Sequence, residues 1–202
     1  GLPITKSPLF AGYTGATDEF NNRDMRMHTT FLKNGQAYWN NDGKWRTTWT
    51  DSDLGNALTA NVRSGSGYQN NKWAVERQVA DNFEAMDYPV IRYAEVLLSY
   101  AEAENEVNGP TKDVLDAVNK VRTRGENLPT VQSTYGTVDK DKMREIIHRE
   151  RRVELSFEDK RWWDILRWKI ADKLPDGSPG VLNRPEKGMY ITKNNDGTLN
   201  YK

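Results

Sequence analysis

The chain of 202 residues contains no cysteine, which excludes disulfide bonds, thiolate catalysis and the cysteine-ligated zinc of zinc fingers. It also lacks any run of about eighteen apolar residues, the length that a membrane-spanning helix requires. Residues 1–20 do not show the basic and then apolar order of a signal peptide. Because the chain opens on Gly1 and its first methionine is Met25, we expect it to be a fragment of a longer protein.

An excess of positive charge is missing as well. The 29 lysine and arginine residues are matched by 29 aspartate and glutamate residues. Even the arginine-rich stretch HRERRVELSFEDKRWWDILRW, residues 148–168, interleaves its arginines with carboxylates. Domains that bind nucleic acid usually present a net basic surface. The composition therefore argues against a nucleic-acid partner.

Helical periodicity is scarce in residues 1–88, which are rich in Asn, Gly, Thr, Asp and aromatic residues. This texture predicts long loops with short strands or turns. Flat aromatic rings flanked by Asn, Asp, Lys and Arg suit a pyranose, whose ring stacks while its hydroxyl groups reach polar side chains. Aromatic residues in loops also often anchor a loop to the core. The candidate ligand-binding residues of this segment are Tyr38, Trp39, Trp45, Trp49, Tyr68 and Trp73.

Residues 89–170 carry the helical periods. Apolar residues at helical spacing predict a helix that begins after Pro89 and ends at Asn108, and a second that follows the N-cap candidate Thr111 and runs to about Arg124. Residues 90–124 are together close to the roughly 34-residue length of a tetratricopeptide hairpin. After a predicted loop, a further helix pair is expected at about 139–158 and 160–170. We expect an irregular tail over 171–202.

Two glutamates lie on the apolar face of the predicted third helix. Glu150 and Glu154 share this face with Met143 and Ile147. A carboxylate removed from water needs partners, so we expect structural ion pairs. The arginines considered as partners are Arg151, Arg152, Arg161 and Arg167. A glycosidase would also use two carboxylates, but these must face each other across a sugar. Two glutamates one helical turn apart point the same way, which argues against catalysis.

Two other patterns have less demanding explanations. Glu145 and His148 have the Glu-x-x-His spacing of di-iron helices, but the chain has only one other histidine, His28, and such a site needs a second copy of the motif. We therefore expect no metal, no cofactor and no catalytic residue. In RWWDILRW, Trp162 and Ile165 lie three apart, which predicts that Trp162 packs in the core.

Three sequence blocks in this order resemble a known family. YPVIRYAEVLLSYAEAENEVNG, AVNKVRTRG and MREIIHRERRVELSFEDKRWWDILRW look like the C-terminal half of the SusD/RagB family of outer-membrane nutrient-binding lipoproteins. The blocks cover residues 88–170. RDMRMHTTFLK and SGYQNNKWAVERQ are similar to weaker family segments and extend the likeness to about residue 20.

The resemblance implies a mainly α, SusD-like domain with tetratricopeptide-type helical hairpins and a long loop-rich segment. Its expected parts are the loop-rich segment 1–88, the helical scaffold 89–170 and the irregular tail 171–202. It also implies a surface protein of the outer membrane that captures glycan or another nutrient oligomer for a TonB-dependent transporter, without catalysis. The lipid-bearing cysteine of the family is absent from this chain. The alternative is a tetratricopeptide-type scaffold that binds a peptide or protein partner.

Overall fold

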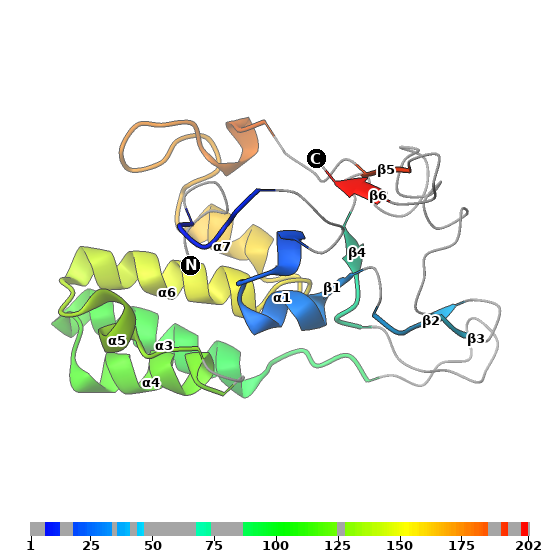
Figure 1. The fold of residues 1–202 in the computed structure, drawn as a ribbon. Coiled ribbons are helices and arrows are strands. Elements are labelled where there is room, and N and C mark those ends of the chain that lie inside the picture. Colours follow the sequence, from blue (N-terminus) through cyan, green and yellow to red (C-terminus); the bar gives the residue numbers. More distant parts are fainter. Residues whose placement is uncertain are drawn as a thin grey trace. The chain divides into compact units, whose positions relative to one another are not determined.

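A computed structural model describes residues 7–12, 18–33, 36–40, 44–46, 68–73, 87–124, 128–185, 191–193 and 199–201. The chain divides into two compact units (Figure 1). Residues 1–86 and 185–202 form one of them, which we call the loop-rich unit, and residues 87–184 form the other, which we call the helical unit. Most of the described helix lies in the helical unit, so the predicted mainly α fold is confirmed.

The loop-rich unit is built from short elements. They are the 3-10 helix η2 (Asp18–Phe20), α1 (Met25–Thr30), β1 (Phe31–Leu32), β2 (Tyr38–Asn40), β3 (Lys44–Arg46), β4 (Gln69–Asn70), β5 (Ile191–Lys193) and β6 (Leu199–Tyr201). The strands pair two by two and antiparallel, β1 with β4, β2 with β3 and β5 with β6. An aspartate starts α1, because the Asp24 carboxylate accepts a hydrogen bond of 2.9 Å from the Arg26 N–H.

The helical unit contains the longer elements. They are α3 (Tyr93–Asn108), α4 (Lys112–Arg122), α5 (Val131–Tyr135), α6 (Lys140–Glu154), α7 (Arg161–Arg167) and the 3-10 helix η3 (Val181–Asn183). The short segment 109–111 joins α3 to α4, and both helices pack against α6 (Figure 1). In the part of the chain that the structure describes, none of the helices has the length and apolarity needed to cross a membrane.

Local residue chemistry sets the ends of these helices. Gly109 adopts φ 77°, a left-handed conformation that favours glycine and ends α3. The Thr111 hydroxyl accepts a hydrogen bond from the Val114 N–H at the start of α4, and the Asp139 carboxylate accepts one of 2.8 Å from the Lys142 N–H at the start of α6.

Three sequence predictions about helix positions were wrong. The helix expected at about 139–158 ends at Glu154, and Phe157 has a left-handed backbone with φ 58°. The helix expected to begin directly after Pro89 begins only at Tyr93, because Arg92 has an extended backbone and its guanidinium binds carboxylates at the end of α6 and beyond. The segment expected to be a loop contains α5, a single short helix whose start is capped by the Thr130 hydroxyl. Five residues are too few to show a helical period.

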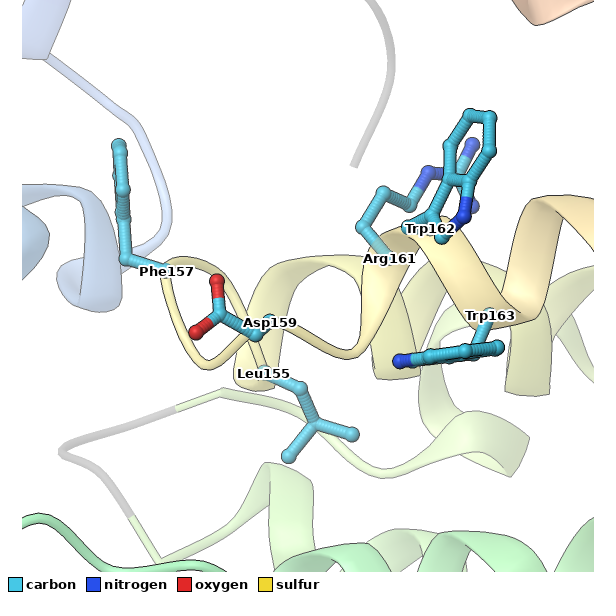
Figure 2. Close-up of a pocket in the computed structure, with 6 residues that line it drawn as sticks. All are labelled: Leu155, Phe157, Asp159, Arg161, Trp162 and Trp163. Atoms are coloured by element: carbon cyan, nitrogen blue, oxygen red, sulfur yellow. The ribbon is translucent and has the colours of Figure 1, made fainter.

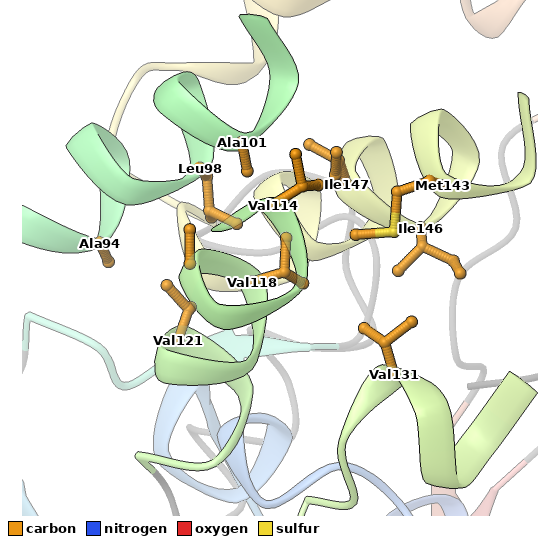
Figure 3. Close-up of a cluster of buried hydrophobic side chains, with 11 residues drawn as sticks. Ala94, Leu98, Ala101, Val114, Val118, Val121, Val131, Met143, Ile146 and Ile147 are labelled. Atoms are coloured by element: carbon orange, nitrogen blue, oxygen red, sulfur yellow. The ribbon is translucent and has the colours of Figure 1, made fainter. Parts of the chain in front are cut away.

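One apolar core holds α3, α4, α5 and α6 together (Figure 3). Its buried members are Ala94, Leu98, Ala101, Val114, Ala117, Val118, Val121, Val131, Met143, Ile146 and Ile147. The small alanines of α3 allow the helices to approach closely, while the branched side chains of α4 and α6 fill the space between them. On α6 the core residues Met143, Ile146 and Ile147 precede the buried charged residues Glu150, Arg151 and Glu154.

Candidate functional site

The hairpin of β2 and β3 holds three of the six candidate ligand-binding residues. Its register pairs Trp39 with Trp45, Tyr38 with Arg46, and Asn40 with Lys44. Directly opposed residues of an antiparallel pair are neighbours on one face of the ribbon. The hairpin therefore brings two tryptophans together at one register position, with a polar or charged residue in each adjoining pair.

The other three candidates lie apart from this register. Tyr68 is half-buried, its hydroxyl donates a hydrogen bond of 2.8 Å to Oε1 of the buried Glu19, and its ring centroid is 5.3 Å from that of Phe31. Trp73 is half-buried, with the Lys72 ammonium 5.9 Å from its ring centroid. Tyr68 and Trp73 thus flank β4. Trp49 lies outside the described residues.

Glu150 is buried on α6 against an arginine of α4. Nη1 of Arg122 donates a hydrogen bond of 2.9 Å to its Oε2, and both side chains are almost fully removed from solvent. The Arg122 guanidinium also donates 3.1 Å to the Pro129 carbonyl. The two opposite charges can stay buried because the guanidinium and the carboxylate form an ion pair with each other.

Glu154 belongs to a second, larger network. Its Oε1 accepts hydrogen bonds from Nη2 of Arg92 at 3.0 Å and from Nη2 of Arg124 at 2.7 Å. Arg92 in turn forks onto the buried Glu158, with 2.6 and 2.8 Å to its two carboxylate oxygens. Both glutamates of the apolar stripe are therefore buried and bound to arginine, as the pattern predicted. Their partners come from the start of α3 and from the end of α4.

The arginines that sequence reasoning had matched to these glutamates lie elsewhere. Arg151 is buried and forks onto Asp164 of α7 with two bonds of 3.1 Å, while its Nη1 donates 3.0 Å to the Ser99 hydroxyl. Arg152 is exposed and Arg161 is half-buried, and neither forms an ion pair with a residue that the structure describes. Arg151 thus ties α6 to α7 and to α3.

Glu102 of α3 is the centre of a third network. Oε2 accepts 2.6 Å from Nη2 of Arg167, Oε1 accepts 2.7 Å from Nε1 of Trp168, and Nε2 of His148 lies 3.6 Å from Oε1. The His148 ring stacks on Trp168 with centroids 3.5 Å apart. Burial alone would raise the pKa of Glu102, but His148, Arg167 and Trp168 together hold that pKa well below its usual range.

These carboxylates are occupied by their partners. Glu150, Glu154 and Glu102 each bind at least one guanidinium, so none is poised as a general acid or base. In the ranges that the structure describes, no group of three or more histidine, aspartate or glutamate side chains is arranged to hold a metal ion. The networks hold helices together.

A pocket that sequence reasoning missed lies where α6 gives way to α7 (Figure 2). Its volume is about 410 Å³, within the range of about 300–1,000 Å³ common for small-molecule sites. The lining residues are Leu155, Phe157, Asp159, Arg161, Trp162 and Trp163. Trp162 and Trp163 are 51% and 65% exposed.

The prediction that Trp162 packs in the core was therefore wrong. The buried positions of α7 are Asp164, which binds Arg151, and Ile165. A helix as short as α7 buries one narrow face, and that face leaves Trp162 and Trp163 open. The tryptophan that does pack is Trp168, just after the helix.

Comparison with known proteins gives the family. The model of the SusD family matches residues 10–200, nearly the whole chain. SusD-like protein P2 of Formosa agariphila is 38% identical over 97 residues, which are 45% of this chain and 19% of that protein. SusD-like protein P38 of the same organism is 42% identical over 86 residues, which are 41% of this chain and 17% of that protein.

A solved structure agrees with the fold. A SusD-like protein from Bacteroides fragilis superimposes with a TM-score of 0.60 at 23% sequence identity, covering 91% of this chain and 33% of that one. The chain thus spans about a fifth of the length of the curated relatives and a third of that structure. With a family model matched over residues 10–200, the chain belongs to the SusD family.

Proposed function

We propose that the protein binds a glycan, or another nutrient oligomer, at the cell surface and passes it to a TonB-dependent outer-membrane transporter. Membership of the SusD family supports a role in glycan or nutrient binding. The structural observation that carries the proposal is the register of the β2–β3 hairpin, which makes Trp39 and Trp45 direct cross-strand partners.

The residues around this tryptophan pair have the chemistry that a sugar needs. Indole is the largest flat apolar surface among side chains, and a pyranose presents apolar C–H faces between its hydroxyl groups. The adjoining pairs bring Tyr38 with Arg46, and Asn40 with Lys44. These residue types donate and accept hydrogen bonds, as the hydroxyl groups of a sugar require.

The proposed role is binding without chemistry. The paired glutamates of the helical unit stabilise helix contacts, and their bound arginines would have to be displaced before either could transfer a proton. The proposal accordingly includes no cofactor and no metal.

Membership of the SusD family is the ground for the part of the proposal that concerns the membrane and the transporter. We propose that the full-length protein is held at the outer surface of the outer membrane by a lipid anchor and lies beside the transporter, as the sequence resemblance implies. A binding protein in that position raises the local concentration of the oligomer at the transporter entrance, which is a gain in effective concentration.

Calorimetric titration of the natural full-length protein with a panel of neutral oligosaccharides tests the binding function. The wild type should bind at least one of them. Trp39→Ala and Trp45→Ala should each weaken that affinity by about tenfold or more, because truncation of a tryptophan hot spot costs about 2 kcal/mol or more and about 1.4 kcal/mol is a factor of ten. Trp168→Phe is the matched control, because Trp168 is held inside the helical unit by Glu102.

Co-purification from outer membranes in mild detergent tests the transporter. A tagged full-length protein should recover a TonB-dependent barrel, identified by mass spectrometry, and the tryptophan variants should recover it equally well. If neither the tagged wild type nor the tagged tryptophan variants recover a TonB-dependent barrel, this part of the proposal is contradicted.

A second candidate function is a helical scaffold for a protein partner, and one observation favours it. The outward side of α3 exposes Tyr93, Val96, Tyr100 and Val107, which repeat at three- and four-residue steps or multiples of seven. Val96→Glu would place a charge in this stripe. The scaffold function predicts that Val96→Glu abolishes recovery of the transporter in the co-purification. If this happens, and the hairpin variants also bind oligosaccharide as tightly as the wild type, the protein is a scaffold for a protein partner and not a glycan-binding protein.

A further inference from the structure

The pocket between α6 and α7 has a construction of its own, distinct from the hairpin. Phe157 lies at one end of the lining and the two indoles lie at the other, with Asp159 between them (Figure 2). Leu155, which is buried, also contributes to the lining. The lining residues that the structure describes all belong to the helical unit.

An unusual backbone places two of these side chains. Phe157 and Asp159 have φ angles of 58° and 57°, in the left-handed region that side chains other than glycine seldom adopt. Glu158, between them, points inward and is held by the fork from Arg92 at 2.6 and 2.8 Å. Strained backbone of this kind persists where its surroundings enforce it, and it gathers at functional sites. Here it turns an aromatic ring and a carboxylate outward on either side of a buried anchor.

The two charged groups of the lining lack ion-pair partners among the described residues. Arg92, Arg122, Arg124, Arg144, Arg151 and Arg167 all bind carboxylates. Arg161 does not, although it is half-buried, and its guanidinium instead lies 5.8 Å from the centroid of Trp168. Asp159 is exposed and accepts no hydrogen bond from a described residue. A half-buried guanidinium without an anion is open to a hydrogen-bonding ligand.

A ligand for this pocket must satisfy three demands at once. It needs apolar faces for indole and phenyl rings, donors for the Asp159 carboxylate and acceptors for the Arg161 guanidinium. A hydroxyl group both donates and accepts, so a neutral polyol meets the two polar demands without carrying opposite charges. A pyranose adds the apolar C–H face that stacks on an indole.

We propose that the pocket lined by Phe157, Asp159, Arg161, Trp162 and Trp163 is a second carbohydrate-binding site, which takes a neutral sugar unit. This second site rests on the proposed function in one respect, namely that the ligand is a carbohydrate. The sugar unit stacks on an indole, its hydroxyl groups donate to Asp159 and accept from Arg161, and the anchored Glu158 keeps the rim in place. A long glycan could then be held at two places on one protein.

Titration of four full-length proteins with neutral oligosaccharides tests the site. They are the wild type, Trp163→Ala, the hairpin double variant Trp39→Ala/Trp45→Ala, and a variant that combines all three substitutions. The hairpin double variant should retain weaker binding, and adding Trp163→Ala should lower this residual affinity by about tenfold or more. Asp159→Asn in the hairpin background should weaken it severalfold, since the charged acceptor is lost.

The matched control is Leu166→Ala, an exposed apolar residue of the same helix outside the lining. It should leave the residual affinity unchanged. Melting temperatures of all variants should stay close to the wild type, which separates lost contacts from lost folding. Residual binding that is the same with and without Trp163 would overturn the second site while leaving the hairpin site standing. Failure of the wild type to bind any oligosaccharide would overturn both.

Oxidative footprinting of the full-length protein adds an independent readout. Trp162 and Trp163 should be oxidised readily in the free protein and protected by a saturating neutral oligosaccharide that binds the hairpin double variant. Two tryptophans that resist oxidation without sugar would show that another part of the full-length protein fills the pocket, and this would also overturn the proposal. Protection by acidic oligosaccharides alone would contradict the neutral ligand.

Discussion

The helical unit and the loop-rich unit differ in the length of their elements and in the contacts that hold them. In the helical unit, Glu150, Glu154 and Glu158 are buried and bound by arginines from distant parts of the chain. In the loop-rich unit, short strands pair two by two, and the register of the β2–β3 hairpin places Trp39 opposite Trp45. The first arrangement fixes helices, and the second is the one that we propose for ligand binding. The difference teaches that dense buried charge can serve the scaffold, and the proposed ligand site lies elsewhere.

The tryptophans of the helical unit refine this contrast. Trp168 donates a hydrogen bond to Glu102 and stacks on His148, so it serves the scaffold. Trp162 and Trp163, only a few residues earlier, are open to solvent. Identical side chains in one short segment therefore have different surroundings, one packed in the scaffold and two exposed.

The largest effect should come from breaking a buried ion pair of the scaffold. Glu150→Ala leaves the buried Arg122 without its carboxylate, and we expect the unfolding free energy to fall by about 3 to 5 kcal/mol. Glu145→Ala is the matched control on the same helix, because Glu145 pairs with Lys142 at the surface and should change stability by less than about 1 kcal/mol. Urea unfolding measures both.

Glu154→Ala should lower the unfolding free energy by less than Glu150→Ala does. Arg124 is 55% exposed and Arg92 keeps its second carboxylate on Glu158, so Glu154→Ala leaves a smaller uncompensated charge. A loss of stability below about 1 kcal/mol for Glu150→Ala would contradict the scaffold role of the pair.

Removing core volume should have the next largest effect. Leu98 is completely buried between α3, α4 and α6, so Leu98→Ala should lower the unfolding free energy by about 2 to 5 kcal/mol. Leu166 is a leucine of similar size with a 45% exposed side chain, and Leu166→Ala should have a much smaller effect. Equal losses for the two variants in chemical denaturation would mean that the core does not hold the helical unit together.

Acid should weaken the scaffold through Glu102. Because the pKa of Glu102 is lowered in the folded state, its network contributes stability that is fully present above the unfolded pKa near 4.5 and is lost as the pH falls below it. Glu102→Gln should therefore reduce stability at neutral pH and flatten the fall of stability below about pH 4.5. Unfolding curves recorded over this range check the slope, and parallel curves for wild type and variant would refute the role of Glu102.

How far the sequence predicts the fold depends on element length. The periods of α3, α4 and α6 were legible because each helix spans three turns or more and buries a continuous stripe such as Ala94, Leu98 and Ala101. The helix α5 was missed because one turn shows no period. Proline suggested the wrong start for α3, since the side-chain contacts of Arg92 decide where that helix begins.

The site was less predictable for a physical reason. Burial of Glu150 followed from its place on an apolar face, but Arg122 lies 28 positions away, and no local pattern identifies it. The pocket depends on the left-handed backbone at Phe157 and Asp159. The apolar spacing in this part of the sequence predicted a continuing helix, so it gave no sign of this backbone. Aspartate tolerates the left-handed conformation better than most residues, so Asp159 was the one local sign in the sequence that the helix ends here.

The smallest effect on stability should come from the hairpin. If Trp39 serves ligand binding, Trp39→Ala should change the unfolding free energy by no more than about 0.5 kcal/mol while it weakens oligosaccharide binding. Differential scanning calorimetry of the free protein measures the first quantity. A substantial drop in melting temperature, with affinity unchanged, would assign Trp39 to packing.

The pairing of Trp39 and Trp45 on the ligand can be measured directly by a double-mutant cycle of oligosaccharide affinity in the full-length protein. Isothermal titrations of the wild type, Trp39→Ala, Trp45→Ala and the double variant give the coupling free energy between the two indoles. Since the register makes them direct partners, we predict that both single variants lose affinity and that the losses are non-additive by about 0.5 kcal/mol or more. Unchanged affinity in both single variants, or strictly additive losses, would contradict a shared sugar platform on the hairpin.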